Sequence, residues 1–102
     1  MPVYVIIEIK IIDKDTYAEY VANVSDIVEK YGGRYLARGG GITAISGNWH
    51  PERVILLEFD AMEQVQKWLA SPEYSEIATL RTSSTISRAI AVEGCSLSGR
   101  TL

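Results

Sequence analysis

The sequence contains few of the residues that cross-link a fold or bind metal ions. Its 102 residues include one cysteine, Cys95, and one histidine, His50. A lone cysteine cannot form an internal disulfide, which favours a reducing, cytoplasmic location over secretion. Because the histidine and the cysteine lie far apart in the sequence, they lack the spacing of metal ligands, and we expect no metal site.

The chain also has no large excess of charge of one sign and no long apolar run. The net charge is −3 and there is no basic stripe, so we expect no nucleic-acid partner. The sequence also lacks a Lys/Arg-rich amphipathic helix of the kind that binds a membrane surface. The apolar run near the N-terminus contains Glu8 and Lys10, is too short to span a bilayer and follows no basic segment, so we expect neither a transmembrane helix nor a signal peptide.

The remaining composition is that of one small globular domain. Hydrophobic residues make up 47% and charged residues 23% of the chain, which is enough for a modest core. We assign the domain to residues 1–94. Residues 95–102 have no periodicity, and we expect this tail to be mobile or packed on a partner.

Four segments have the β-branched residues and alternating pattern of strands. They are residues 2–12, 34–38, 53–59 and 85–94. Gly39–Gly41 follows the second of them. A phosphate cradle would need a helix directly after these glycines, so a bulge or bend with more strand at 42–46 is the better interpretation.

Two helical regions separate these strands. Apolar residues at helical spacing follow the candidate caps Asp13 and Asp15 and predict one helix that ends at Gly32-Gly33. Asp60 in a cap position predicts a short second helix, and Ser71 caps a third.

The element order βαββαβ predicts the ferredoxin-like α+β fold, with a four-stranded antiparallel sheet and the helices on one face. We expect the strand–helix–strand crossovers to place the first and third strands side by side and parallel at the sheet centre. The odd-numbered residues of these strands, Val3 to Ile11 and Ile55 to Phe59, are apolar and suit the face under the helices.

The even-numbered residues of the same two strands form a face too apolar for water and too polar for a plain core. They are Tyr4, Ile6, Glu8, Val54, Leu56 and Glu58. A second copy of the sheet would cover this face, so we predict a homodimer, with a cavity between or beside the two sheets and Trp49 and Arg53 near the dimer edge. The alternative is a monomer whose sheet has one face open to solvent, although long apolar patches are uncommon on monomers.

Several short motifs together resemble one known family. They are Gly32-Gly33-Arg34-Tyr35-Leu36-Ala37-Arg38-Gly39-Gly40, Gly47-Asn48-Trp49, Pro51-Glu52-Arg53, Glu58-Phe59, Trp68 and Ser71-Pro72-Glu73-Tyr74. With these motifs the chain resembles the domain of unknown function 1330 family over nearly its whole length up to Gly94. The resemblance implies a dimeric α/β-barrel of ferredoxin-like subunits, without a firmly assigned reaction. More distant dimeric α/β-barrel proteins include cofactor-free monooxygenases, haem-degrading oxygenases, muconolactone isomerases and small-ligand binding modules, so the fold alone does not give the function.

Glu8, Glu58 and Arg38 form the sharpest candidate site. If the first and third strands are parallel, both carboxylates lie at equal depth on one face, and a hairpin of the second and third strands brings Arg38 to the level of Glu58. Two close carboxylates raise one pKa, as a general acid or base requires, whereas Arg38 lowers both pKa values. The alternative is a structural ion pair inside the dimer.

Aromatic and basic residues provide candidate ligand contacts. The aromatic ones have the helical spacing of a core, but together with Arg38 they also suit a pocket for a small planar or carboxylate-bearing ligand. They are Tyr20, Trp68 and Tyr74, next to Tyr17. Arg81 is either a second anion contact or a partner of the helix dipole. His50 lies before a proline in a turn and is either a functional loop residue or a solvated side chain.

Two functions therefore fit the sequence, both without a bound cofactor. The first is a cofactor-independent enzyme that performs proton transfer or oxygenation on a small aromatic or carboxylic substrate, with Arg38 anchoring the anion and Glu58 moving the proton. The second is a non-catalytic, ligand-binding or stress-related homodimer that uses the same cavity. The state of Glu58 separates them, because catalysis requires it to face an open cavity rather than to be locked against Arg38.

Overall fold

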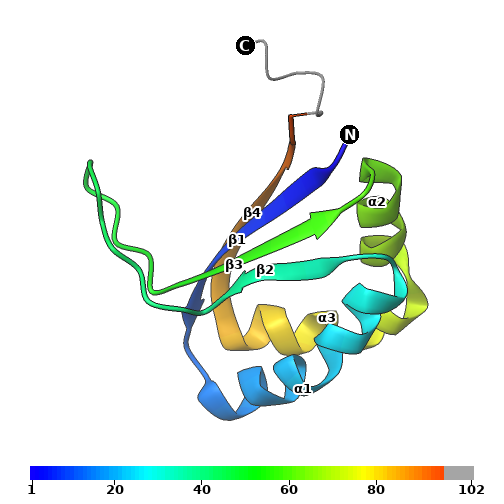
Figure 1. The fold of residues 1–102 in the computed structure, drawn as a ribbon. Helices are drawn as coiled ribbons and strands as arrows, with labels where there is room; N and C mark the ends of the chain where they lie inside the picture. Colours follow the sequence, from blue (N-terminus) through cyan, green and yellow to red (C-terminus); the bar gives the residue numbers. More distant parts are fainter. Residues whose placement is uncertain (96–102) are drawn as a thin grey trace.

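The protein, described here over residues 1–95 by a computed structural model, alternates strands and helices in the predicted order. The elements are β1 (Val3–Ile11), α1 (Lys14–Lys30), β2 (Arg34–Arg38), β3 (Arg53–Phe59), α2 (Met62–Ala70), α3 (Pro72–Ser84) and β4 (Thr85–Glu93) (Figure 1). The ferredoxin-like order is confirmed, with α2 and α3 together as the second helical region. The prediction for the tail lies outside the described residues, apart from Cys95.

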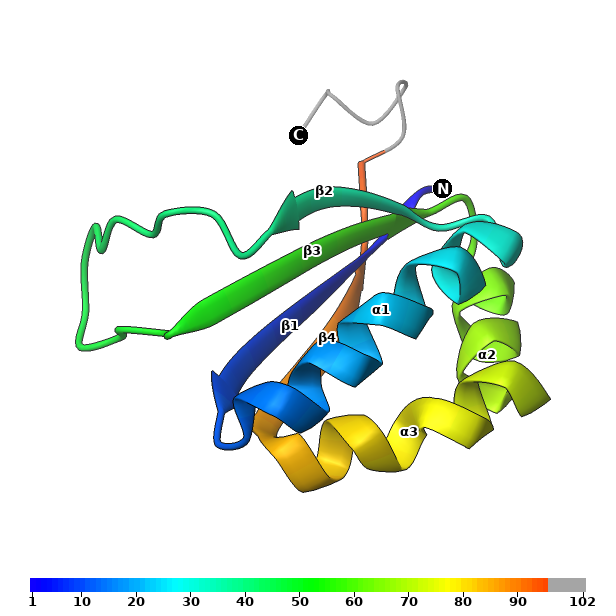
Figure 2. The same ribbon diagram turned by 90° about the horizontal axis from the view of Figure 1, so that it is seen from below.

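The four strands form one sheet in the order β2-β3-β1-β4, and every pairing is antiparallel. All three helices lie on one face of this sheet (Figure 2). The central position of β1 and β3 is as predicted, but the expectation that they run parallel is wrong. Each strand–helix–strand crossover skips one position in the sheet. β1 and β2 therefore run in the same direction, and β3 lies between them and runs in the opposite direction. Val3 consequently lies opposite Phe59.

The core lies between the helices and the odd-numbered side of the central strands, as the alternation predicts. Its most buried strand residues include Val3, Val5 and Ile9 from β1 and Leu57 and Phe59 from β3. The helices contribute their apolar sides, with buried Tyr17, Tyr20, Val24 and Val28 from α1, Val65 and Trp68 from α2, and Tyr74 and Ile77 from α3. The rings of Phe59 and Trp68 stack with their centroids 5.6 Å apart, which ties β3 to α2.

Local sequence signals fix the ends of the helices. The Asp13 side chain accepts a hydrogen bond from the backbone N–H of Thr16, and Ser71 accepts one from the backbone N–H of Tyr74. α1 ends where Gly32 adopts a φ of +88°, and the N–H of Gly33 donates to the carbonyl of Val28 in a Schellman arrangement.

The start of α2 differs by one residue from the prediction. Its cap is Ala61 rather than Asp60. Since alanine has no side-chain acceptor, the Gln64 side chain accepts hydrogen bonds from the backbone N–H groups of both Asp60 and Ala61.

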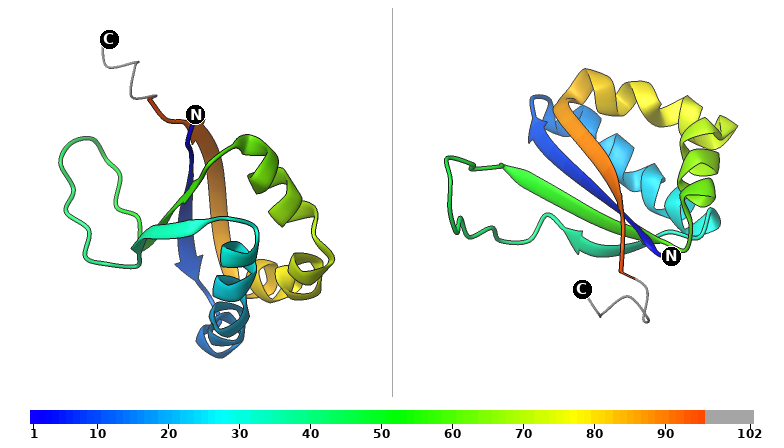
Figure 3. Two further views of the ribbon diagram at one scale, coloured as in Figure 1. Left: turned by 45° about the vertical axis from the view of Figure 1, so that its right-hand side comes forward. Right: turned by 90° about the horizontal axis from the view of Figure 1, so that it is seen from above.

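Residues 39–52 form an irregular arm between β2 and β3. The arm projects from the sheet away from the helices (Figure 3, left). The predicted strand at 42–46 is therefore wrong, because residues of this segment pair with no neighbouring strand in the described part of the chain. Gly39 and Gly47 have φ angles of +71° and +77°, which other residues rarely adopt, and they bend the arm at its root and near its tip. Within residues 1–95, no helix is long and apolar enough to cross a membrane.

Candidate functional site

A small cavity lies between the sheet and the helices. Aliphatic side chains, tyrosines, one tryptophan and three arginines line it: Ile7, Ile9, Tyr17, Tyr20, Val21, Val24, Tyr35, Arg38, Arg53, Ile55, Leu57, Trp68 and Arg81. Its volume is ≈ 30 Å³. One water needs about 10–15 Å³, so the cavity holds two or three waters or the head group of a ligand.

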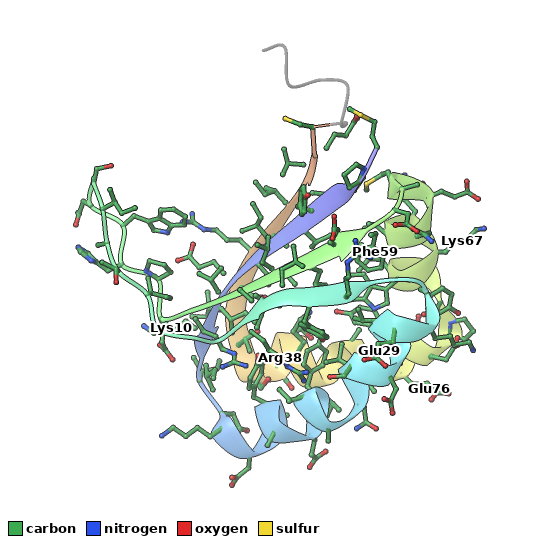
Figure 4. All side chains as sticks on the ribbon, viewed as in Figure 1. Lys10, Glu29, Arg38, Phe59, Lys67 and Glu76 are labelled. Atoms are coloured by element: carbon green, nitrogen blue, oxygen red, sulfur yellow. The ribbon has the colours of Figure 1, made fainter. Side chains whose placement is uncertain are left out.

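A β-bulge directs Arg38 into this cavity. In β2, Tyr35 lies opposite Leu57 and Arg38 opposite Ile55, with the register shifted between positions 35 and 37. Residues three apart in a regular strand point to opposite faces, so the extra residue places both Tyr35 and Arg38 on the side of the helices. The Arg38 guanidinium lies 4.4 Å from the centre of the Tyr35 ring, and its Nη2 donates to Ser25 Oγ at 2.6 Å. Figure 4 shows Arg38 between the sheet and the helices.

Arg53 is held at the cavity by an aromatic partner and by a glycine. Its Nε donates to the Tyr17 hydroxyl at 3.1 Å, and its guanidinium lies 5.6 Å from the centre of that ring. A Cβ on Gly39 would lie 1.9 Å from Arg53 Nη1. The root of the arm therefore packs directly on Arg53, and the φ of +71° at Gly39 favours glycine there.

Two buried donors at the cavity have no acceptor among the described residues. Arg81 Nη1 donates to Ser87 Oγ at 2.9 Å, but Arg81 Nε is buried without a partner, and so is Trp68 Nε1. Buried polar groups are normally paired, and each one left alone costs about 1–3 kcal/mol. Both residues line the cavity, so the site has more hydrogen-bond donors than the described residues satisfy.

The buried hydroxyl of Tyr20 keeps its proton. Tyr20 and Tyr74 share a buried hydrogen bond of 3.1 Å between their hydroxyl oxygens. Burial, and next the neighbouring Tyr74, raise the pKa of Tyr20 above its ordinary value. Because no carboxylate and no histidine among residues 1–95 lines the cavity, the charged groups described there are all cationic and its strongest hydrogen-bonding groups are donors.

The predicted cluster of Glu8, Glu58 and Arg38 is not assembled, so that prediction of proximity is wrong. In the antiparallel register Glu58 lies opposite Tyr4 and Glu8 opposite Val54, which separates the two acids by four residues, or about 13 Å along the strand. Both acids lie on the open face of the sheet, whereas Arg38 lies on the other.

Each of the two acids is instead bound by a different arginine on the open face. Arg34 Nη2 contacts Glu58 Oε1 at 2.5 Å, and the Glu58 side chain is only 14% exposed. Arg88 Nε donates to Glu8 Oε1 at 2.8 Å, and Trp49 Nε1 approaches the same oxygen at 3.4 Å. The proton-transfer role of Glu58 stays a prediction, but Glu8, the neighbouring carboxylate on which it was based, lies elsewhere on the sheet.

His50 also lies away from the arginines of the cavity. It borders a hollow on the outer side of the sheet with Glu8, Lys10, Glu52 and Arg88. Of the predicted ligand contacts, the structure brings Tyr20, Trp68, Arg38 and Arg81 to the cavity, with Tyr74 bonded to Tyr20, and leaves Glu8 and His50 outside. Within residues 1–95, no three His, Cys, Asp or Glu side chains are placed to hold a metal ion.

Sequence reasoning missed Arg53 and Tyr35 as cavity residues. Arg53 has a readable signal, since it shares the odd-numbered side of β3 with Ile55 and Leu57. Tyr35 and Arg38 have no such signal, because the bulge that aligns them is a feature of the β2–β3 pairing.

Comparison with known proteins supports the fold. The family model described as "Domain of unknown function (DUF1330)" matches residues 2–95. No curated protein matches the chain.

Three solved structures illustrate the range of proteins with this fold. A protein of unknown function from Rhodopseudomonas palustris has 18% identity and a TM-score of 0.78, over 93% of this chain and 83% of that one. SnoaB from Streptomyces nogalater, described as a cofactor-independent oxygenase, has 9% identity and a TM-score of 0.64, over 93% and 94%. A dimeric ferredoxin-like protein of unknown function from Thermobifida fusca has 12% identity and a TM-score of 0.66, over 92% of each chain. At these identities the similarity establishes the fold.

The raised pKa of Tyr20 predicts how the protein responds to alkaline pH. An unfolded tyrosine loses its proton near pH ~10, whereas folded Tyr20 retains it, so the free energy of unfolding decreases as the pH rises above about 10. We expect Tyr20→Phe to show a smaller decrease than the wild type between about pH 9 and 11, measured by urea denaturation. Equal decreases in both proteins would contradict the assignment.

Proposed function

The chain belongs to the DUF1330 family, and we propose that it binds a small molecule that carries an anionic group on a planar, apolar ring. The observation that carries this proposal is the pair of buried, unpartnered donors, Arg81 Nε and Trp68 Nε1, at a cavity lined by three arginines and no acid. A carboxylate is planar, accepts two hydrogen bonds at once and is the preferred partner of a guanidinium.

The size and lining of the cavity define which part of the ligand enters first. At ≈ 30 Å³ the cavity accepts a head group, and the surrounding tyrosines and aliphatic side chains suit a ring behind it. Arg38 is exposed although it lines the cavity, so it lies at the opening and its guanidinium can move to admit the ring. The single cysteine of the chain supports a reducing, cytoplasmic location for this activity.

Benzoate is a direct probe of the proposed site, and benzamide is its uncharged counterpart. We expect benzoate to bind at least about tenfold more tightly than benzamide, because a charge-assisted hydrogen bond contributes about 1.5–3 kcal/mol. Arg81→Gln removes the unpartnered donor and should weaken benzoate binding by about 10- to 100-fold in NMR titrations.

Lys67→Gln is the matched control for Arg81→Gln. It removes one positive charge from an exposed side chain on α2 that does not line the cavity. Its affinity for benzoate should equal that of the wild type. Equal affinity of the wild type for benzoate and benzamide would refute the anion site.

Cofactor-independent oxygenation is the second candidate function. It is supported by an apolar, aromatic cavity whose cationic groups stabilise an electron-rich anion of the substrate, and by the structural similarity to SnoaB. The pairing of Glu58 with Arg34 on the opposite face favours simple binding over catalysis, because it leaves the cavity without a carboxylate base.

Oxygen uptake distinguishes the two candidates, with 3,4-dihydroxybenzoate as the probe. An oxygenase should consume oxygen above the rate without protein, and Arg81→Gln should slow that uptake through weaker binding. Glu58→Gln tests the predicted proton transfer, since loss of uptake with unchanged affinity for the probe is expected only if Glu58 takes part in the reaction. Uptake at the protein-free rate would exclude oxygenation of this substrate.

We also propose that the protein is a homodimer joined through the open face of its sheet. This face, opposite the helices, carries Tyr4, Ile6, Val54, Leu56, Ile86, Ile90 and Val92 together with the two ion pairs. Ile86, Ile90 and Val92 are 64%, 63% and 45% exposed, which is costly in water and favours association of this surface with another. A similar structure is described as dimeric.

Ile90→Asp tests the proposed dimer. A charge placed within the apolar face should cost about 3 kcal/mol and raise the dissociation constant of the dimer roughly 100-fold, measured by sedimentation velocity. Leu69→Asp is the control, since Leu69 is 50% exposed on α2, away from the open face. A wild-type protein that remains monomeric at ~100 μM would contradict the proposal.

A further inference from the structure

The arm, residues 39–52, exposes apolar side chains that the described residues, 1–95, cover only in part. Ile45 is 95% exposed, Trp49 55% and Ile42 43%. Exposed isoleucines cost free energy in water, and a projecting segment that concentrates them is typical of an interaction surface.

Few contacts hold the arm to its own subunit. At its root, the backbone N–H of Gly39 donates to the carbonyl of Val54. Near the end of the arm there are two long hydrogen bonds of 3.4 Å. Trp49 Nε1 donates to Glu8 Oε1, and the backbone N–H of Ile11 donates to Glu52 Oε1. Among the described residues, no backbone hydrogen bond joins residues 40–51 to another element. The arm is therefore attached at its base and open along its length.

The inner side of the arm is continuous with the open face of the sheet. One hollow, of ≈ 260 Å³, lies between Ile42–Ser46, Trp49, Pro51 and Val54, and Val54 belongs to the open face. A second, of ≈ 220 Å³, lies between Trp49 and the sheet residues Ile6 and Ile90. Trp49 borders both hollows, so a protein surface that packs on the open face also contacts the arm.

We propose that the arm clasps a second copy of this chain, so that each subunit of the homodimer holds the edge of the other sheet. This inference rests on the homodimer proposed above and adds the element that secures it. The edge held by the arm is β4 of the partner subunit.

The sheet order identifies β4 as the strand that the arm meets. The arm leaves from β2 and β3 at one side of the sheet, and β4 is the edge strand on the other side. A two-fold axis parallel to the strands, between two sheets packed face to face, lays β4 of one copy over the β2 side of the other. This arrangement brings the exposed Ile86 and Ile90 of one copy to the apolar arm of the other.

Charge favours a second copy over a partner of another kind. The acids of the open face, Glu8 and Glu58, are each paired with an arginine of the same subunit. These four paired side chains add no net charge where two such faces meet, whereas a strongly basic or acidic partner would find little complementary charge. The apolar side chains of the open face would pack against the same side chains of the second copy, as in any two-fold symmetric interface.

Ile45→Asp tests the clasp, because this side chain is almost fully exposed within its own subunit and the substitution should not disturb folding. In sedimentation velocity we expect the dissociation constant of the dimer to rise at least about tenfold, while Leu69→Asp leaves it unchanged. The affinity for benzoate should stay at the wild-type value, which separates this test from that of the cavity. A dissociation constant equal to that of the wild type would overturn the clasp and leave the homodimer standing. A monomeric wild type would overturn both and leave the binding proposal untouched.

Disulfide formation between copies provides a second test, in a Cys95→Ser background. Chains with Ile45→Cys are mixed with chains with Ile86→Cys or, as the control, with Leu69→Cys, and are then oxidised mildly. We expect the mixed dimer with Ile86→Cys and no mixed dimer with Leu69→Cys. Equal yields in the two mixtures, or no product in either, would overturn the proposed arrangement.

Discussion

The antiparallel pairing of β1 with β3 at the centre of the sheet determines which side chains of this protein meet. It sets odd-numbered residues such as Leu57 and Phe59 against the helices and leaves Tyr4, Ile6 and Leu56 on the open face. Because the strands run in opposite directions, residues at equal distances from their strand starts lie at opposite ends of the sheet. One pairing thus creates the core, the open face and the separation of Glu8 from Glu58.

The cavity depends on a local departure from this regular sheet. The bulge in β2 adds Arg38 and Tyr35 to the same side, where Arg53 and Arg81 also lie. Three guanidinium groups without an acid are electrostatically unfavourable unless they face water or an anion. The protein accepts this arrangement together with two unpaired buried donors, and sites that carry such a cost are typically functional.

The two faces of the sheet have separate tasks in this interpretation. Acids and arginines on the open face pair with one another within the subunit, so their charges are already balanced before the face is covered. On the helix face the described residues that line the cavity include three arginines and no acid, and the proposed ligand would balance their charge. A regular sheet keeps these two groups of charges apart because successive residues alternate between its faces.

The sequence by itself determined the order of the elements, the buried side of β1 and β3, and the helix ends at Asp13, Gly32 and Ser71, since these follow from local periodicity and from capping residues. It also identified Arg38, Arg81, Tyr20 and Trp68 as candidate ligand contacts, and all four line the cavity. Only the tertiary structure decided the direction of β1 against β3, the bulge that turns Arg38 inward, the pairing of Glu58 with Arg34 and the irregular arm in place of a strand at 42–46. Each of these depends on contacts between segments distant in the chain, and neither periodicity nor propensity within one segment carries that information.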